Sequence, residues 1–456
     1  MPHVHPSARR SGLLRRSFMR PYPEAVRGRG VWLWDAEGRR YLDLAGSAAV
    51  NFIGHGVREV ADAMARQARA LEFVHSSQFV TGIAEEFAAE VLRFAGEHFR
   101  GGKVYFTCGG SEAVETALKL ARQFQVESGH ASRFRILSRW QSYHGATLGA
   151  LAVSGNRRRR DIYLPMVRRP RTFEHVGLPY CYRCRYDGDE CARRYAQEVE
   201  RAIADSRGTT AAFIFEPVSG ATLGAAVPPR GYLEGVARIC RGRGVLLIAD
   251  EVMTGFGRTG RNFAVQHFGV QPDIIVAGKG IASGYVPLGA VIASRRVAEA
   301  IARGSGAFVH GFTYNAHPVA VAAGRAVLAY MRRRRLVEAA DSGRARSTAA
   351  AFARALESLR DCRSVGDVRG LGLLRGVEFV TDKKSSKPFP PEVNFAGRVA
   401  QAAARRGVMV YPMQGCVDGL RGDHLLLAPP AVITPREIGW AIEHLREAIK
   451  HAEAAI

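Results

Sequence analysis

Short apolar runs separated by helix-length segments dominate the middle of the chain, from about residue 103 to 295. The runs are KVYFT, FRILS, AAFIFEP, GVLLIADE, DIIVAG and GAVIAS. Apolar strands that alternate with helical connections are typical of a parallel sheet covered by helices on both faces. The pattern therefore predicts an α/β fold with a mainly parallel central sheet.

The two ends of the chain follow other patterns. Between about 20 and 60, two short alternating runs flank DAEG and predict a β-hairpin, and helical periodicity follows from about 57 to 100. After about 316 come helices rich in Ala and Arg, then the runs VRGLGLLRGVEFV, GVMVYP and HLLLAPP, which predict further strands. We expect these strands to form a smaller α+β domain that the N-terminal hairpin completes.

The length of the chain, 456 residues, suits a large domain with a smaller companion. We divide it into a mobile N-terminal segment at 1–20, the N-terminal part of the small domain at 21–65, the large domain at 66–320 and the C-terminal small domain at 321–456.

The composition is that of a soluble globular protein, but the net charge of +23 is unusual. Positive charge attracts nucleic acids, membranes and small anions. The Arg runs at 157–160 and 332–335 are not interleaved with aromatic residues, so we interpret them as solvated surface. No apolar run approaches the ~20 residues that cross a bilayer, and the N-terminus lacks the apolar core of a secretory signal. We expect a cytoplasmic protein without a nucleic-acid or membrane partner.

Three of the seven cysteines form the only sequence cluster of this residue type, CYRCRYDGDEC, with Cys181, Cys184 and Cys191. A zinc site usually needs four ligands at defined spacings, and no second Cys-x-x-Cys supplies the fourth, although His175 lies nearby in sequence. We interpret the three residues as loop cysteines, predict no metal, and take the odd cysteine count to suit a reducing compartment.

Lysine is rare in this chain: only seven of its 65 cationic side chains are Lys, and all the others are Arg. One of the seven, Lys279, follows the apolar run DIIVAG. A primary amine can lose its proton and attack a carbonyl group, whereas an arginine in a protein effectively cannot. Lys279 is therefore a candidate nucleophile at the end of a strand.

Three other predicted strands also end in chemically suggestive residues. After KVYFT, a glycine turn with Gly110 and Ser111 opens a helix, which suits a phosphate but is also an ordinary helix start. After FRILS come Tyr143 and His144, an aromatic pair that can cover a planar ligand or pack beneath a loop. After GVLLI comes Asp250, a buried acid that needs a cationic or donating partner.

Ligands of open parallel sheets bind beyond the carboxyl ends of the strands. A phosphate cradle, an aromatic side chain, a buried acid and a reactive amine at that edge together meet the needs of pyridoxal 5′-phosphate (PLP). The amine forms a Schiff base, and the acid keeps the pyridine nitrogen protonated. The sequence thus predicts a PLP site.

Several motifs spread over residues 20 to 450 resemble those of the class III (ω-type) aminotransferases, PLP enzymes of fold type I. They are CGGSEAVETALKLAR, YHGATLGAL, EPVSGA, PPRGYL, DEVMTGFGRTG, DIIVAGKGIASGYVPLGAVI and FTYNAHPVA. The resemblance implies a large PLP-binding domain with a mainly parallel sheet and a smaller α+β domain. It also implies an aminotransferase that is a homodimer with active sites at the interface.

The resemblance assigns roles residue by residue. Lys279 is implied to form the internal aldimine and to move protons, Asp250 to lie under the pyridine nitrogen, and Tyr143 to stack on the ring. The remaining residues of the expected cofactor site are Gly110, Ser111, His144, Glu216, Val252 and, from the partner subunit, Thr313. The expected substrate residues are Arg421, which is either a carboxylate ligand or solvent-facing, with Phe79 and Ser47.

The expected reaction moves an amino group from an amine or amino acid to a ketone, an aldehyde or a keto acid. Alternatives with the same cofactor are a decarboxylase, an aminomutase and a racemase. Val252 and Met253 follow Glu251 where the decarboxylases carry a characteristic glutamine, which argues against the first. A remote alternative is a basic nucleic-acid-binding protein with a degenerate PLP fold.

Overall fold

The computed structural model describes residues 11–19, 21–167, 172–184, 186–337 and 344–456, with 344–346 described by their backbone alone. Half of the segment predicted to be mobile, residues 1–10 and 20, therefore lies outside the described residues. The α-helices are α2 (Gly46–Ala49), α3 (Arg58–Ala70), α4 (Gly82–Ala95), α5 (Gly110–Glu127), α6 (Leu148–Val153), α7 (Arg157–Arg160), α8 (Leu164–Val167), α9 (Gly188–Asp205), α10 (Tyr232–Gly242), α11 (Arg295–Arg303), α12 (Pro318–Arg333), α13 (Arg344–Glu357), α14 (Phe395–Arg405) and α15 (Pro435–Ala454).

A central sheet forms in the middle of the chain, as its apolar runs predict. From edge to edge its strands are β4 (Lys103–Thr107), β10 (Gly289–Ala293), β9 (Ile274–Ala277), β8 (Leu246–Asp250), β7 (Thr210–Phe215), β5 (Arg135–Arg139) and β6 (Phe173–Val176). Only β10 runs against its neighbours β4 and β9, while β9, β8, β7, β5 and β6 are parallel. The mainly parallel α/β sheet is therefore confirmed.

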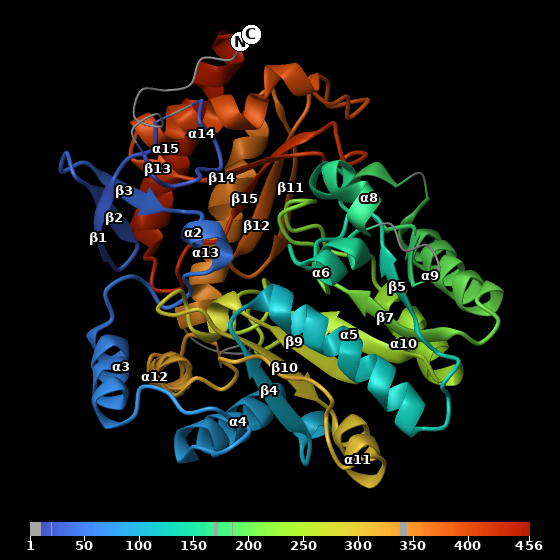
Figure 1. Ribbon diagram of the computed structural model, residues 1–456. Coiled ribbons are helices and arrows are strands. Elements are labelled where there is room, and N and C mark those ends of the chain that lie inside the picture. Colours follow the sequence, from blue (N-terminus) through green and yellow to red (C-terminus); the bar gives the residue numbers. More distant parts are fainter. Residues whose placement is uncertain (1–10, 20, 168–171, 185, 338–343) are drawn as a thin grey trace.

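Both faces of this sheet are buried, which explains why its strands are apolar without alternation. On β8, Leu246 and Ile248 pack in a core with α5, whereas Leu247 and Ala249 belong to the core on the opposite face. Helix α5 crosses one face, and α4 and α10 pack on the other side (Figure 1). The carboxyl ends of the parallel strands point toward the part of the molecule that contains the two smaller sheets.

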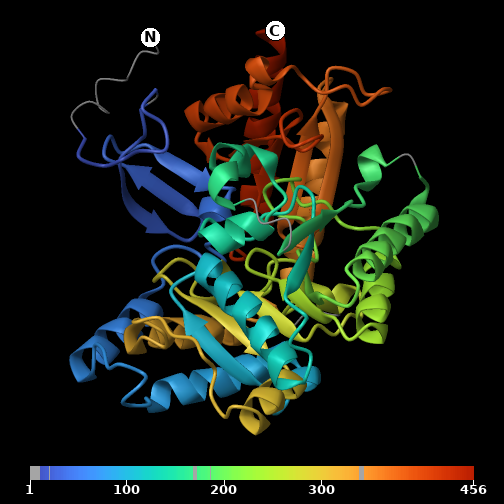
Figure 2. The same cartoon turned by 45° about the vertical axis from the view of Figure 1, so that its right-hand side comes forward.

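The remaining strands build two smaller sheets beside the central one. The first is β1 (Ala25–Arg29), β2 (Trp32–Asp35), β3 (Arg40–Asp43) and β13 (Val408–Met409), and the second is β11 (Val365–Leu371), β12 (Leu374–Phe379), β15 (Asp423–Leu427) and β14 (Tyr411–Gln414). The expected hairpin around DAEG is present, because β2 and β3 pair antiparallel. Strand β13 then joins β3, so the N-terminal strands lie beside C-terminal elements (Figure 2).

Two details of the strands differ from the sequence pattern. GVMVYP is split between the two smaller sheets as β13 and β14, and the edge strand β6 was not predicted, because FEHV is too polar to stand out.

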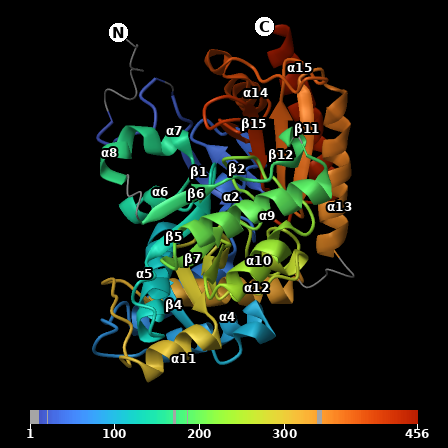
Figure 3. The same ribbon diagram turned by 90° about the vertical axis from the view of Figure 1, so that its right-hand side faces the viewer.

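Helices α13 and α15 pack together along one side of the β11–β12 sheet (Figure 3). Among the described helices, none combines the length and the apolar character needed to cross a membrane. The domain boundaries given above stay predictions.

Candidate active site

The end of β8 separates two neighbouring acids onto opposite faces of the central sheet. Side chains alternate along a strand, so Asp250 follows Leu246 and Ile248 on the α5 face. Glu251 points the other way, where it accepts a hydrogen bond from the Val265 N–H at 2.8 Å. Burial raises the pKa of Glu251 to about 7. Of the two acids, only Asp250 faces the candidate site.

Asp250 is 5% exposed and is paired with His144, which is also buried. The His144 Nδ1 lies 2.7 Å from Asp250 Oδ2, and the Val252 N–H donates to Asp250 Oδ1 at 3.1 Å. The other ring nitrogen of His144, Nε2, is buried without a hydrogen-bond partner. The pair therefore holds a carboxylate in a fixed orientation at the strand end, as a charged group away from water requires.

Lys279 lies at the start of the 3₁₀ turn Lys279–Ile281 (η5), two residues after β9 ends. Its backbone is left-handed, with φ of +44°, a conformation that non-glycine residues seldom adopt and that clusters at functional sites. Burial lowers the pKa of Lys279 to about 8, and the carboxyl groups of Asp250 and Glu216 oppose that shift. The result is an amine that is uncharged much more often than an exposed lysine.

The start of α5 lies directly beside Lys279. A Cβ on Gly110, the first residue of α5, would lie 2.8 Å from Val252 Cγ1, and a Cβ on Gly278 would lie 3.1 Å from the same atom. The two glycines thus allow the helix start, Val252 and the lysine turn to meet. Ser111 Oγ accepts a hydrogen bond from the Ala146 N–H at 3.0 Å. The free N–H groups and the dipole of the helix make this a favourable place for an anion.

Glu216 and Tyr143 lie on the same side of the site, after β7 and β5. Glu216 is 7% exposed, and its carboxylate accepts from the Gly220 N–H at 3.1 Å and the Tyr143 N–H at 3.4 Å. Burial raises the pKa of Glu216. Arg139, which sequence reasoning missed, is also buried and donates to the Glu216 carbonyl oxygen at 2.5 Å. Glu216 is therefore held from its side chain and its backbone.

The Arg run at 157–160 is not uniformly solvated, which corrects the sequence interpretation. Arg157 and Arg158 are exposed, but Arg160 is only 8% exposed and the Arg159 guanidinium lies 4.5 Å from the centre of the Tyr143 ring. The reason is that a helix turn points its side chains in all directions, so a run of four cannot stay on one face. A cation–π contact of this kind orients the tyrosine.

Arg258, within GFGRTG, connects three distant parts of the chain beneath the site. It is 2% exposed and donates hydrogen bonds to the backbone oxygens of Asn51 (2.8 Å), Ala428 (2.9 Å) and Pro429 (2.6 Å). Burial lowers the pKa of Arg258 to about 9. The motif was recognised in the sequence, but this structural role was not, because the acceptors are backbone atoms that a sequence does not mark.

The expected substrate residues lie on three different segments of the chain. Ser47 is exposed on the α2 turn and donates to Asp43 Oδ2 at 2.8 Å. Phe79 is 63% exposed in the loop after α3. The Arg421 side chain is 58% exposed and pairs with Asp418 at 2.7 Å, so within this chain it has the solvent-facing position that the sequence left open. Their roles toward substrate stay predictions.

Thr313 is exposed in the segment between α11 and α12. This segment lies along the start of α5, since His310 Nε2 is 2.8 Å from Thr116 Oγ1 and the Tyr314 carbonyl oxygen accepts from Cys108 Sγ at 3.9 Å. Nearby, Tyr314 contacts Phe73 with ring centres 5.5 Å apart. Thr313 is thus presented on the outside of the chain.

Comparisons with known proteins agree with the chemistry of this site. A family model described as aminotransferase class-III matches residues 18–449. An uncharacterized aminotransferase of Bacillus subtilis, YodT, is 36% identical over 445 residues, which cover 97% of this chain and 98% of that protein. An adenosylmethionine-8-amino-7-oxononanoate aminotransferase of Geobacter sulfurreducens is 34% identical, with 93% of this chain and 91% of that protein covered.

Solved structures agree equally well. An (S)-enantioselective omega-transaminase from Thermomicrobium roseum superposes with a TM-score of 0.88 at 38% identity, covering 97% of this chain and 96% of that one. A PLP-bound amine transaminase from an uncultivated Pseudomonas species gives 0.87 at 33% identity, with 99% of both chains covered. The fold type I architecture and the aminotransferase activity expected from the motifs are confirmed, and the family implies PLP as cofactor. The chain belongs to the class III aminotransferases.

Proposed function

We propose that this aminotransferase holds PLP between Lys279, Asp250 and the start of α5, and that Lys279 is its catalytic amine. The observation that carries the proposal is the amine itself, with a pKa of about 8, close to a buried acid at the same edge of the sheet. A lysine of lowered pKa is suited to attack a carbonyl group and to carry protons. Amine or amino-acid donors and carbonyl acceptors are the substrates.

The residues present fit the phosphate and the pyridine nitrogen of the cofactor. The start of α5, with Gly110 and Ser111, would hold the phosphate, because helix starts bind anions. Asp250 would hold the pyridine nitrogen, because the bonds from His144 and Val252 fix its carboxylate and leave lone pairs free. Tyr143 and Val252 would contact the ring.

When bound, PLP supplies an aldehyde that takes up the amino group and a ring that accepts electron density from the carbon beside it. The chain supplies the rest. Lys279 Nζ moves a proton away from the donor carbon, which its low pKa favours. The Asp250 carboxylate, oriented by His144 Nδ1 at 2.7 Å, would pair with the protonated pyridine nitrogen. Glu216, with a pKa raised by burial, is suited to hold a proton near the substrate.

We further propose a homodimer in which Thr313 completes the site of the second copy. Two neighbouring segments of the surface expose large apolar side chains, namely Phe79 and Val80 (63% and 81% exposed) and Val309 and Tyr314 (80% and 57%). Asn315 Oδ1 and Ser76 Oγ, 2.6 Å apart, join these segments. Exposed apolar patches of this kind are typical of protein interfaces.

All seven cysteines are free thiols, which supports a cytoplasmic location.

Mixing two inactive variants tests both proposals at once. Lys279→Ala should abolish turnover and remove the borohydride-stable PLP label from the peptide that carries residue 279, while circular dichroism shows a folded protein. Thr313→Ala should be strongly impaired. In mixed dimers, one site combines Lys279 from one copy with Thr313 from the other, so about a quarter of wild-type activity should return.

The control is each variant alone, carried through the same dissociation and mixing. Absence of any recovery, with mixed dimers demonstrated by differently tagged chains, would show that Thr313 acts within its own chain. A Lys279→Ala variant that keeps full activity and label would remove the catalytic assignment.

A further inference from the structure

Three thiols gather where the segment after β6 meets the first turn of α9. Cys181 begins the 3₁₀ turn Cys181–Arg183 (η3), Cys184 follows it, and Cys191 is the fourth residue of α9. The Cys184 and Cys191 sulfurs are 3.0 Å apart, and the Cys181 thiol also interacts with Cys191. Exposure falls along the set, because Cys181 is exposed, Cys184 is part-buried and Cys191 is buried.

A metal does not account for this cluster. Within the part of the chain that the structure describes, no three His, Cys, Asp or Glu side chains are placed to hold a metal ion. The nearby His175 is engaged elsewhere, since its Nε2 lies 3.1 Å from the Ser154 carbonyl oxygen and its ring stacks on Trp140. Burial lowers the pKa of His175 to about 4. The three thiols therefore lack the fourth ligand that zinc requires.

We propose that Cys184 and Cys191 form a reversible disulfide, with Cys181 as the thiol through which it is made. The two sulfurs need to approach by only about 1 Å to reach bonding distance. Burial, and then the neighbouring thiols, raises the pKa of Cys191, so this thiol is neutral in the reduced state and does not repel its neighbour. The exposed Cys181 is the member that a reagent reaches first.

The oxidant is a small-molecule disulfide such as glutathione disulfide, and the exchange balances. The Cys181 thiolate attacks one sulfur of the reagent, its S–S bond breaks, and one thiol leaves. Cys191 then attacks Cys181 and releases the second thiol, and Cys184 attacks Cys191, which returns Cys181 to its reduced form. Two protein thiols lose two electrons and two protons in total, and the reagent becomes two thiols.

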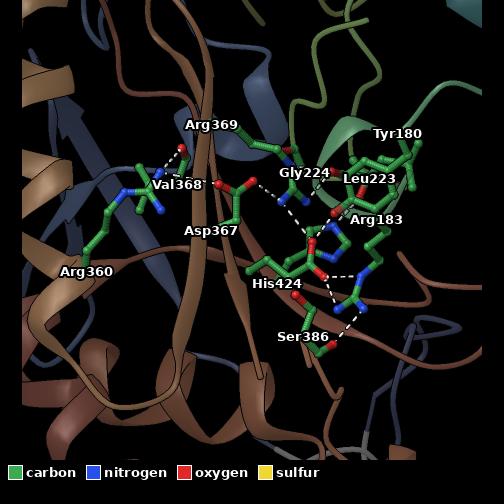
Figure 4. Close-up of polar contacts among 12 residues, drawn as sticks. Tyr180, Arg183, Leu223, Gly224, Arg360, Asp367, Val368, Arg369, Ser386 and His424 are labelled. Carbon is green, nitrogen blue, oxygen red and sulfur yellow. Dashed lines mark hydrogen bonds and ion pairs between the residues drawn. The ribbon is translucent and has the colours of Figure 1, made fainter. Parts of the chain in front are cut away.

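The disulfide would lie at one end of a segment that connects α9 to the β11–β12 sheet. Arg183, between Cys181 and Cys184, donates to the fully buried Glu378 of β12 at 2.8 Å through Nε and at 2.5 Å through a terminal nitrogen. Tyr180 donates to the same carboxylate, and Arg369 pairs with it at 2.8 Å (Figure 4). The segment is thus anchored in the second sheet, and the disulfide would tie its other end to α9.

The buried network explains why the anchor holds while the thiols change state. Although burial opposes it, Arg369 and Arg183 lower the pKa of Glu378, so the carboxylate stays charged. Arg183 also donates to the Ser386 carbonyl oxygen at 2.7 Å, and Arg369 donates to the Leu223 carbonyl oxygen at 2.6 Å (Figure 4). The redox change is therefore confined to the end of the segment at α9.

Peptide mapping of the holoenzyme tests the proposal directly. The enzyme is equilibrated in buffers of graded glutathione to glutathione-disulfide ratio, alkylated, and digested with trypsin. Trypsin cuts after Arg183, Arg185 and Arg193, so a disulfide joins the dipeptide 184–185 to the peptide 186–193. We expect this linked pair to appear as the ratio falls and to disappear when thiol is added back.

Single variants distinguish the roles of the three cysteines. Cys191→Ser should abolish the linked pair, Cys181→Ser should slow its formation at least tenfold without preventing it, and Cys240→Ser, a buried cysteine elsewhere, should change neither. The proposal is overturned if the linked pair is missing at the most oxidising ratio, or if the purified enzyme carries about one zinc per chain that Cys184→Ser removes. The presence or absence of the linked pair is measured on the wild-type protein, so this test remains decisive even if a variant fails to fold.

Discussion

The assignment of Asp250 makes a sharp prediction, because a second acid stands beside it in the sequence. Asp250→Asn keeps the size of the side chain and can still accept the Val252 N–H, but it removes the negative charge. An amide cannot keep a proton on a pyridine nitrogen, and His144 Nδ1 would lose the carboxylate oxygen that lies 2.7 Å away. Asp250 is also the largest influence that supports the charged form of Lys279.

The size of the effect follows from the burial of the pair. Both His144 and Asp250 are at most 5% exposed. Removing the charged partner of a buried polar contact costs up to about 3–5 kcal/mol. Felt in the transition state, this loss slows turnover by about 10² to 10³-fold or more. The pKa of Lys279 should also fall further below 8, because one of the charges that opposes burial is gone.

The assay is the half-reaction with an amine donor, and the change in cofactor absorbance monitors its rate. Glu251→Gln is the matched control, since this acid faces the other side of the sheet. It should keep activity within about threefold while changing stability. Burial raises the pKa of Glu251 to about 7. The free energy of unfolding of the wild type should therefore fall by about 3 kcal/mol as the pH rises from about 4.5 to 7. The Glu251→Gln variant should not show this fall. An unimpaired Asp250→Asn, or a crippled Glu251→Gln, would refute the assignment.

Two further predictions concern Lys279 and Arg258. Since an amine attacks only when uncharged, the rate at which the apoenzyme captures PLP should rise about tenfold per pH unit up to about pH 8 and then become constant. Stopped-flow absorbance measures this capture rate, and a profile that levels only near pH 10.5 would contradict the lowered pKa of Lys279. Arg258→Ala should cost about 3–5 kcal/mol, because three backbone oxygens lose a charged donor, whereas the exposed neighbour Arg261→Ala should change stability by less than about 0.5 kcal/mol. Urea unfolding compares the two, and equal midpoints would contradict the role of Arg258.

The ends of the strands could be predicted from sequence because they obey one rule. A strand buried on both faces is apolar throughout, so the first polar or glycine residue after it marks the edge where ligands bind. That rule pointed to the segments after the strands, which carry Gly110, Tyr143, Asp250 and Lys279, before any coordinates. It also predicted the mainly parallel sheet that the structure confirms.

Other features could not be predicted, for physical reasons. The apolar pattern of β10 carries no information about direction, so its antiparallel course was invisible. The strand pattern alone did not tell which acid of DE faces the site; the family resemblance assigned Asp250, and the strand register separates it from Glu251. Arg159 was missed because its Arg run was assumed to be solvated, whereas its guanidinium lies on an aromatic ring. The role of Arg258 was missed because its acceptors are backbone oxygens, which a sequence does not mark.

The contacts of Arg258 set a condition on how the protein is made. The guanidinium needs oxygen acceptors from residues near 50 and near 428, and a ribosome delivers these about 380 codons apart. A chain that buried Arg258 before the last of them had emerged would hold in its interior a cation without these acceptors. Folding of the catalytic centre is therefore tied to synthesis of the C-terminal segment, and fragments that stop before Pro429 should be inactive.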